Sequence, residues 1–142
     1  MEEINYIYSD NLIKNIFVKT KTIAIVGASP DILRPSYRVM DYLIKEGFKI
    51  YPVNPQFLNE TILGEKVFGK LSHIKERIDL VNIFRRPEFI EEIVKEAISI
   101  KTKTIWMQLG IINYSADKLA KKNNINSIMN KCTKLEYIRL FK

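Results

Sequence analysis

Thr22-Ile23-Ala24-Ile25-Val26-Gly27-Ala28-Ser29-Pro30 is the stretch that decides the fold of this chain. Its first five residues form an apolar and mostly β-branched run, which predicts a buried strand that Gly27 ends. Apolar residues then recur at helical spacing from Ser36 to Ile44, and Gly47 follows as a stop signal for a helix. The stretch therefore predicts a strand, a tight turn and a helix.

The same alternation continues along the chain. Further strands are predicted at 48–53, 80–84, 104–109 and 125–129, and further helices at 87–100 and 116–123. Strands that are apolar on nearly every residue, separated by amphipathic helices, are typical of a parallel sheet that is covered on both faces. We predict an α/β fold: a doubly wound, mainly parallel, Rossmann-like sheet of five to six strands with helices on both faces.

A length of 142 residues suits one domain, residues 1–142, with one hydrophobic core. Residues 1–19 are expected to form an N-terminal helical extension packed on it, with the helix itself at 10–18, and residues 133–140 to form a C-terminal helix. The least regular segment is 57–73, where 66–68 is a candidate short strand. This segment could close over a ligand.

Composition limits the compartment and the classes of partner that are expected for the protein. Its single cysteine, Cys132, cannot form an internal disulfide, and the opening Met1-Glu2-Glu3 lacks the features of a secretory signal, so we expect a cytoplasmic protein. No apolar run approaches the length of a membrane span. The net charge of +7 arises from basic residues scattered over the chain, and the basic stretch 117–142 lacks the interleaved aromatic residues of a nucleic-acid platform. Protein partners stay open.

In doubly wound sheets the ligand lies beyond the carboxyl ends of the strands. After the first strand the residues there are Gly27-Ala28-Ser29-Pro30. A glycine allows a sharp turn and a close approach of the backbone to a ligand, and the start of the following helix attracts phosphate. The alternative is that Gly27 only permits the turn and Ser29 only satisfies the local backbone.

The ends of the other strands refine this prediction. The second strand runs into Val53-Asn54-Pro55 without the acidic residue that a NAD site places there, which argues against NAD. Phe84-Arg85-Arg86 follows a later strand and suits phosphate, unless the arginines pair with nearby glutamates. Gln108 and Gly110 end the next strand, whereas Trp106 within it is expected in the core.

Together with Arg34-Pro35-Ser36-Tyr37, these motifs resemble the stand-alone bacterial-type CoA-binding domain proteins, which are related in fold to the CoA-binding domain of the succinyl-CoA synthetase alpha subunit. The resemblance runs from about residue 20 to about residue 138. It implies that coenzyme A or an acyl-CoA is the ligand. The site residues that it and the strand ends predict are Gly27, Ala28, Ser29, Pro30, Arg34, Ser36, Val53, Asn54, Pro55, Phe84, Arg85, Arg86, Gln108 and Gly110.

No metal-ligand cluster, carboxylate pair or Ser/His/Asp spacing stands at the strand ends, and the one histidine, His73, lies in the irregular segment. We therefore expect a CoA-binding protein that is not an enzyme. The alternative is an NAD(P)-binding redox enzyme or sensor on the same fold. Cys132 follows the last strand and precedes a helix, a position that permits a mixed disulfide with CoA.

Overall fold

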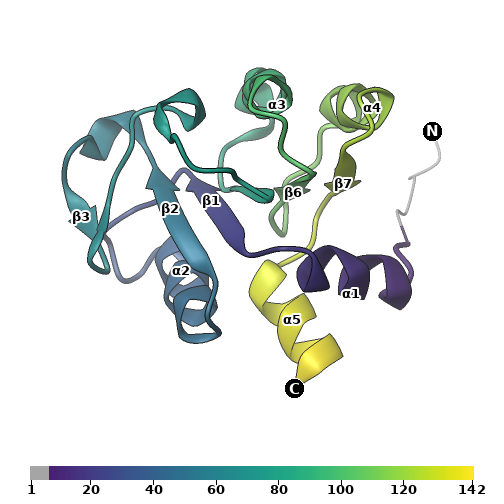
Figure 1. The fold of residues 1–142 in the computed structure, drawn as a ribbon, viewed down its shortest axis with the longest axis horizontal. Coiled ribbons are helices and arrows are strands. Elements are labelled where there is room, and N and C mark those ends of the chain that lie inside the picture. Colours follow the sequence, from purple (N-terminus) through teal and green to yellow (C-terminus); the bar gives the residue numbers. More distant parts are fainter. Residues whose placement is uncertain (1–6) are drawn as a thin grey trace.

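The computed structural model describes residues 7–142, and Figure 1 shows a central sheet between two layers of helices. Residues 1–6, which begin the predicted extension 1–19, lie outside the described part. Within residues 7–142 the main sheet has five strands in the order β2-β1-β5-β6-β7, and every neighbouring pair is parallel. The strands are β1 (Thr22–Val26), β2 (Lys49–Val53), β5 (Leu80–Ile83), β6 (Thr104–Met107) and β7 (Asn126–Ile128). The predicted fold class is confirmed.

Five helices cover the sheet in the described part of the chain, and Figure 1 shows helices on both of its faces. They are α1 (Asp10–Val18), α2 (Pro35–Lys45), α3 (Ile90–Ser99), α4 (Tyr114–Lys122) and α5 (Thr133–Phe141). Helices α3 and α4 pack on one face, and α1, α2 and α5 pack on the opposite one. Short 3₁₀ turns occur at Pro55–Phe57, Leu71–His73 and Pro87–Phe89.

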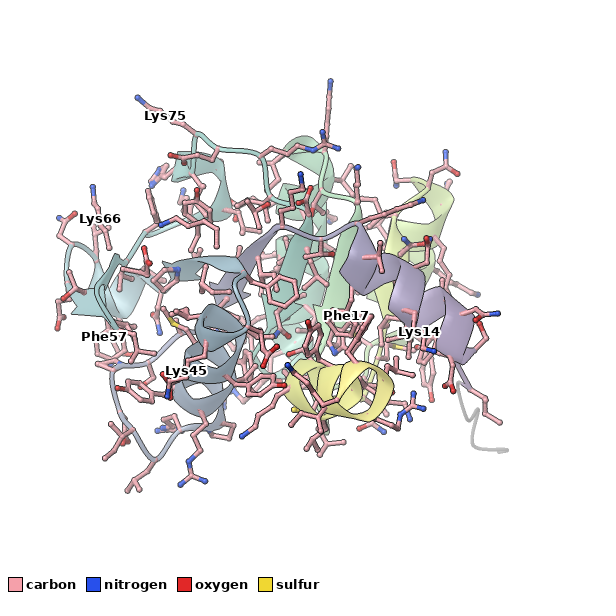
Figure 2. All side chains as sticks on the ribbon, turned by 60° about the horizontal axis from the view of Figure 1, so that its bottom comes forward. Lys14, Phe17, Lys45, Phe57, Lys66 and Lys75 are labelled. Carbon is pink, nitrogen blue, oxygen red and sulfur yellow. The ribbon has the colours of Figure 1, made fainter. Side chains whose placement is uncertain are left out.

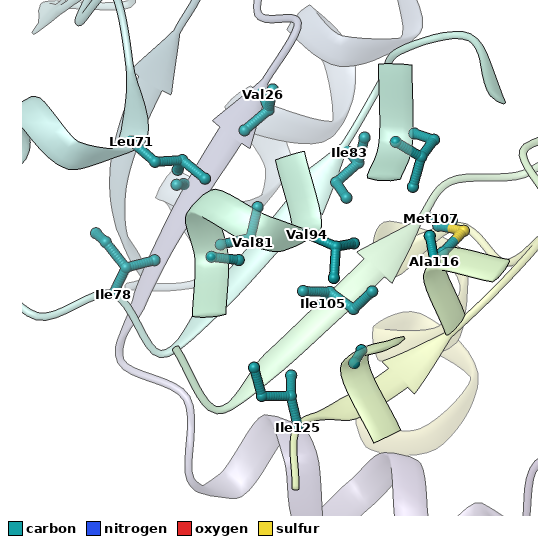
Figure 3. Close-up of a cluster of buried hydrophobic side chains, with 14 of the residues drawn as sticks. Val26, Leu71, Ile78, Val81, Ile83, Val94, Ile105, Met107, Ala116 and Ile125 are labelled. Atoms are coloured by element: carbon teal, nitrogen blue, oxygen red, sulfur yellow. The ribbon is translucent and has the colours of Figure 1, made fainter. Parts of the chain in front are cut away.

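Alternate strand residues supply the two cores, as the two-residue period of a strand requires. Val81 and Ile105 point toward α3 and α4, where they meet Val94 (Figure 3). On the other face Phe17 of α1 packs with its ring centroid 5.5 Å from that of Trp106 and 5.3 Å from that of Tyr137 of α5 (Figure 2). Trp106 is fully buried, as predicted.

The irregular segment is held along the outer edge of β2. β3 (Thr61–Ile62) and β4 (Glu65–Lys66) form a small antiparallel hairpin, and Phe68 bridges Val53 in parallel. The candidate strand at 66–68 is therefore divided between this hairpin and a bridge to the main sheet. The Phe68 amide donates to the Pro52 carbonyl at 2.9 Å, so the segment is fastened to the strand beside it.

Polar side chains cap the starts of two helices, α1 and α4, and α4 begins earlier than the sequence predicted. α4 begins at Tyr114 because the Asn113 side chain accepts a hydrogen bond from the Ala116 amide. α1 has the predicted bounds, and Ser9 caps it in the same way. No helix in residues 7–142 has both the length and the apolar character needed to cross a membrane.

Candidate functional site

A cleft of about 1170 Å³ opens at the carboxyl ends of the parallel strands. The chain leaves β1 toward β2 on one side and later returns to β5 on the other, so the loops after β1 and β5 diverge here. This is the place where doubly wound sheets bind ligands. Segments that follow β1, β2, β5 and β6, together with the start of α5, line the cleft.

The cleft brings together most of the predicted site residues, although they come from distant parts of the chain. Those that line it are Gly27, Ser29, Arg34, Ser36, Asn54, Phe84, Arg85, Arg86, Gln108, Gly110 and Cys132. Ala28, Pro30, Val53 and Pro55 do not line it. Further lining residues that the sequence reasoning did not name as site residues include Asp31, Gln56, Phe57, Phe89, Leu109, Ile111, Lys134 and Leu135.

The turn after β1 is built on Gly27, whose φ of +87° suits glycine. A Cβ atom there would stand 2.5 Å from the Phe84 carbonyl oxygen, so the turn lies directly against the loop after β5. The Gly27 and Ala28 amides both donate to the Val53 carbonyl, at 2.9 and 3.3 Å. These two N–H groups therefore bond to β2 and do not face the cleft, and the Ala28 side chain is buried in the core on the α2 face.

Ser29 and Asp31 organise the rest of this loop. The Ser29 hydroxyl oxygen accepts from the Asp31 amide at 3.1 Å, and its own proton stays available to a ligand. One carboxylate oxygen of Asp31 accepts a hydrogen bond from the Leu33 amide. The other lies 3.9 Å from the Arg34 Nε, and both side chains of this pair are exposed. Such an exposed pair is weak, so a phosphate can compete for Arg34.

Positive charge dominates the lining of the cleft. Five cationic side chains and one carboxylate line it, which gives 5 − 1 = +4: Arg34, Arg38, Arg85, Arg86 and Lys134 against Asp31. The Arg85 guanidinium lies 4.4 Å from the centroid of the Phe89 ring, and that of Arg86 lies 5.5 Å away. Arg86 also pairs with Glu88 at 3.0 Å, with both side chains largely exposed. The lining suits an anion of several charges.

The start of α2 borders the cleft without a side-chain cap. Side chains do cap other helix starts: Ser9 caps α1, Asn113 caps α4, and Asn54 caps the 3₁₀ turn at Pro55–Phe57 beside the cleft. Free N–H groups at the start of α2, with the partial positive charge of the helix dipole, favour phosphate.

Gln108 has a role that the sequence did not reveal. Its side chain is buried, and its Oε1 accepts from the Thr133 amide at 3.1 Å and from the Thr133 hydroxyl at 3.2 Å. The Asn82 side-chain amide donates to the same hydroxyl at 2.9 Å. Three polar residues thus fasten the start of α5 to β5 and β6, and the polar Asn82 inside an apolar strand was the signal for this network.

Asn54 similarly fastens β2 to the first turn. Its Nδ2 donates to the Ala28 carbonyl at 2.9 Å, and its Oδ1 accepts from the Gln56 amide at 3.0 Å. The Asn54 side chain therefore fixes the wall of the cleft. Phe57, three residues further on, is the one residue of segment 57–73 that lines the cleft in the described chain.

The cleft offers no metal centre among the described residues, since no three His, Cys, Asp or Glu side chains cluster in residues 7–142. Cys132 is partly buried at the residue before α5 and lines the cleft beside Lys134 and Leu135. The arrangement is suited to holding an elongated anionic ligand.

Known proteins resemble this chain in sequence or in fold. YneT of Bacillus subtilis, an uncharacterized protein, is 34% identical over 125 residues, which make up 88% of this chain and 91% of YneT. An ADP-forming acetate–CoA ligase of Methanocaldococcus jannaschii is 29% identical over 122 residues, and this chain spans 17% of its length. A solved hypothetical protein from Pyrococcus horikoshii superposes with a TM-score of 0.92 and 35% identity over 100% of both chains.

The model of the CoA binding domain family matches residues 21–138. That range contains the whole five-stranded sheet and every segment that lines the cleft, from Gly27 to Leu135. This chain therefore belongs to the CoA-binding domain family.

Proposed function

We propose that the chain binds coenzyme A or an acyl-CoA in the cleft at the carboxyl ends of its strands, as a binding protein without a catalytic step of its own. The observation that carries the proposal is the excess of positive charge in this cleft. The lining has a net charge of +4, from five cations and Asp31. Coenzyme A carries about four negative charges on its pyrophosphate and 3′-phosphate.

The order of segments along the sheet edge supports a particular orientation. The segment after β2 contributes the aromatic Phe57, and the segments after β1 and β5 contribute the arginines. The segments after β6 and β7 contribute neutral residues, Cys132 and Lys134. Coenzyme A has the same order of adenine, phosphates and pantetheine thiol. The adenine would lie near Phe57, and the thiol would lie near Cys132.

Two features support coenzyme A over NAD(P) and binding over catalysis. β2 ends in Val53 and Asn54, so no carboxylate stands where a NAD site holds its ribose hydroxyls. Asp31 is the one carboxylate in the described lining, and it already accepts a backbone hydrogen bond. No second carboxylate and no histidine stands in the described lining to pair with Asp31 as acid and base.

Calorimetric titration tests the proposal with CoA, acetyl-CoA, dephospho-CoA, NAD, NADP and ATP as ligands. We expect CoA to bind more tightly than dephospho-CoA and the two nicotinamide nucleotides. Replacing Arg85 with Gln should weaken CoA binding by about 10- to 100-fold, because a charge-assisted hydrogen bond contributes about 1.5–3 kcal/mol. NAD binding that exceeds CoA binding would overturn the choice of ligand.

Arg77→Gln is the matched control for Arg85→Gln. Arg77 is an exposed arginine whose Nε lies 3.5 Å from Asp79, and it does not line the cleft. Its replacement removes the same positive charge from the protein. We expect the CoA affinity of Arg77→Gln to lie within about twofold of the wild-type value, since exposed charges away from the ligand are screened by salt.

A further inference from the structure

The cleft is polarised from one end to the other. Its arginines come from the segments that follow β1 and β5, two strands that are neighbours in the sheet. The segment after β6 contributes Gln108, Leu109, Gly110 and Ile111, none of them charged. The apolar end of the cleft is thus displaced from the arginines by at least one strand spacing, about 5 Å.

Two large apolar side chains stand exposed at this end. Leu109 is 63% exposed and Leu135 is 56% exposed, and both line the cleft. Ile111, two residues after Leu109, is partly buried and also lines the cleft. Leucines gathered at the mouth of a binding cleft gain stability when an apolar group covers them.

Cys132 lies at this apolar end of the cleft, where the proposed orientation places the thiol of coenzyme A. It precedes Leu135 by less than one helical turn and lines the same cleft. With the phosphates held at the arginines, the pantetheine arm leads toward Cys132 and the leucines. A group attached to the ligand sulfur would therefore emerge against Leu109 and Leu135.

We propose that Leu109, Ile111 and Leu135 form an acyl subsite that takes an uncharged, apolar acyl chain carried on the sulfur of coenzyme A. The inference rests on the proposed function and names the class of acyl-CoA that the cleft favours.

The charge near this subsite argues against an acidic acyl group. Lys134 is the one cation on the α5 side of the cleft within the described chain, and its ammonium lies 5.6 Å from the centroid of the Tyr42 ring on α2. Lys134 is thus held toward α2. A carboxylate at the end of the acyl chain would meet the leucines without a partner and would lose its hydration.

Calorimetry with CoA, acetyl-CoA, hexanoyl-CoA and succinyl-CoA tests the acyl subsite. We expect hexanoyl-CoA to bind about tenfold more tightly than acetyl-CoA, because each partly buried methylene multiplies affinity about twofold. Succinyl-CoA should bind no more tightly than CoA. In the double variant Leu109→Gln/Leu135→Gln, the ratio of hexanoyl-CoA affinity to acetyl-CoA affinity should fall to about one, whatever the change in the affinity for CoA itself.

Leu12→Gln is the matched control, because Leu12 is also an exposed helical leucine, on α1, and does not line the cleft. Leu12→Gln should still bind hexanoyl-CoA about tenfold more tightly than acetyl-CoA. Equal binding of CoA, acetyl-CoA and hexanoyl-CoA by the wild type, or a gain that survives in the double variant, would overturn the acyl subsite and leave the proposed function standing. Failure of the wild type to bind any of the four ligands would overturn the proposed function itself.

Discussion

Gly27 holds a backbone position with no room for a side chain. Its φ is +87°, and a Cβ atom would stand 2.5 Å from the Phe84 carbonyl oxygen, which is part of the backbone and cannot rotate away. We expect Gly27→Ala to lower the free energy of unfolding by about 2 kcal/mol or more, from backbone strain and the clash together. Urea denaturation measures the loss.

A comparison with Gly64→Ala separates the backbone strain from the steric clash. Gly64 has a similar φ of +81°, but nothing lies within 4 Å of the position that its Cβ would take. Gly64→Ala should therefore lower the free energy of unfolding by the cost of the backbone strain alone, about 1 kcal/mol. Equal losses in the two variants would contradict the close contact between the first turn and the loop after β5.

Cys132 should form a mixed disulfide with coenzyme A. Its thiolate would attack one sulfur of CoA disulfide, form a new S–S bond and release one CoA thiolate. Because the cleft binds the phosphates and raises the local concentration of the reagent, CoA disulfide should react at least tenfold faster than glutathione disulfide. Mass spectrometry of non-reduced protein follows the adduct.

Cys132→Ser removes the one cysteine of the chain and should abolish the adduct, and a thiol reductant should reverse it in the wild type. If CoA disulfide left Cys132 unmodified or reacted no faster than glutathione disulfide, the thiol of bound CoA would not lie at Cys132.

At the scale of elements, the position of α5 depends on one hydroxyl. The Thr133 Oγ1 donates to Gln108 and accepts from Asn82, in a place with no exposed surface. Thr133→Val leaves both partners short of a hydrogen bond while it keeps the shape of the side chain. We expect a loss of about 1–3 kcal/mol in the free energy of unfolding and weaker CoA binding.

Thr133→Ser keeps the hydroxyl and should retain most of both properties, measured by denaturation and calorimetry side by side. A Val variant as stable as the wild type would show that the hydroxyl does not hold α5.

Asp79 joins the amino ends of β1 and β5. Burial of its carboxyl acts to raise its pKa, but hydrogen bonds from the Lys21 and Thr22 amides, at 2.9 and 3.2 Å, together with nearby Arg77, hold the pKa below its ordinary value. A lowered pKa in the folded state means that this stabilisation is complete above the unfolded value of about 4 and is lost as pH falls through the folded value.

Asp79→Asn should therefore destabilise the protein at pH 7 and much less at pH 2–3, measured by denaturation across this range. Asp41→Asn is the control, because Asp41 pairs with Lys45 on the surface of α2, where such pairs contribute little. A pH-independent difference between the wild type and Asp79→Asn would contradict the role of the ionised carboxylate.

The sequence predicted elements well where local signals decide them. The bounds of α1 follow from a short-range amphipathic pattern, and the apolar runs of β5 and β6 were recognisable because both strands are buried at every residue. The order of the strands could not be predicted, because no local pattern specifies which strand pairs with which. Gln108 shows the same limit, since its partner Thr133 lies 25 residues further along the chain.

For the whole molecule, the candidate site was predictable as a place more than as a set of contacts. The carboxyl edge and its arginines follow from the alternation of strands and helices. The Gly27 and Ala28 amides bind Val53 rather than the cleft, because the turn folds back onto β2. Such an orientation depends on the tertiary arrangement and leaves no mark in the residue pattern.

The distribution of charge over the molecule leads to a prediction about salt. The lysines project from separate elements, as Lys14, Lys45, Lys66 and Lys75 do in Figure 2, while four arginines line the cleft. We expect CoA affinity to fall about tenfold between 0.05 and 0.5 M NaCl, by calorimetry, because salt screens the attraction between phosphates and arginines. Pantetheine, which has no phosphate, should bind independently of salt; a salt-independent CoA affinity would contradict the electrostatic account.

The cleft takes its walls from Gly27 through Leu135, which is nearly the whole chain. During synthesis on the ribosome, β1 and β2 therefore emerge long before β5, which completes the pairing of β1. A nascent chain that ends before Cys132 still lacks the wall made by Cys132, Lys134 and Leu135. Because a ligand stabilises only the state that binds it, coenzyme A would stabilise finished chains and leave truncated ones exposed to proteolysis.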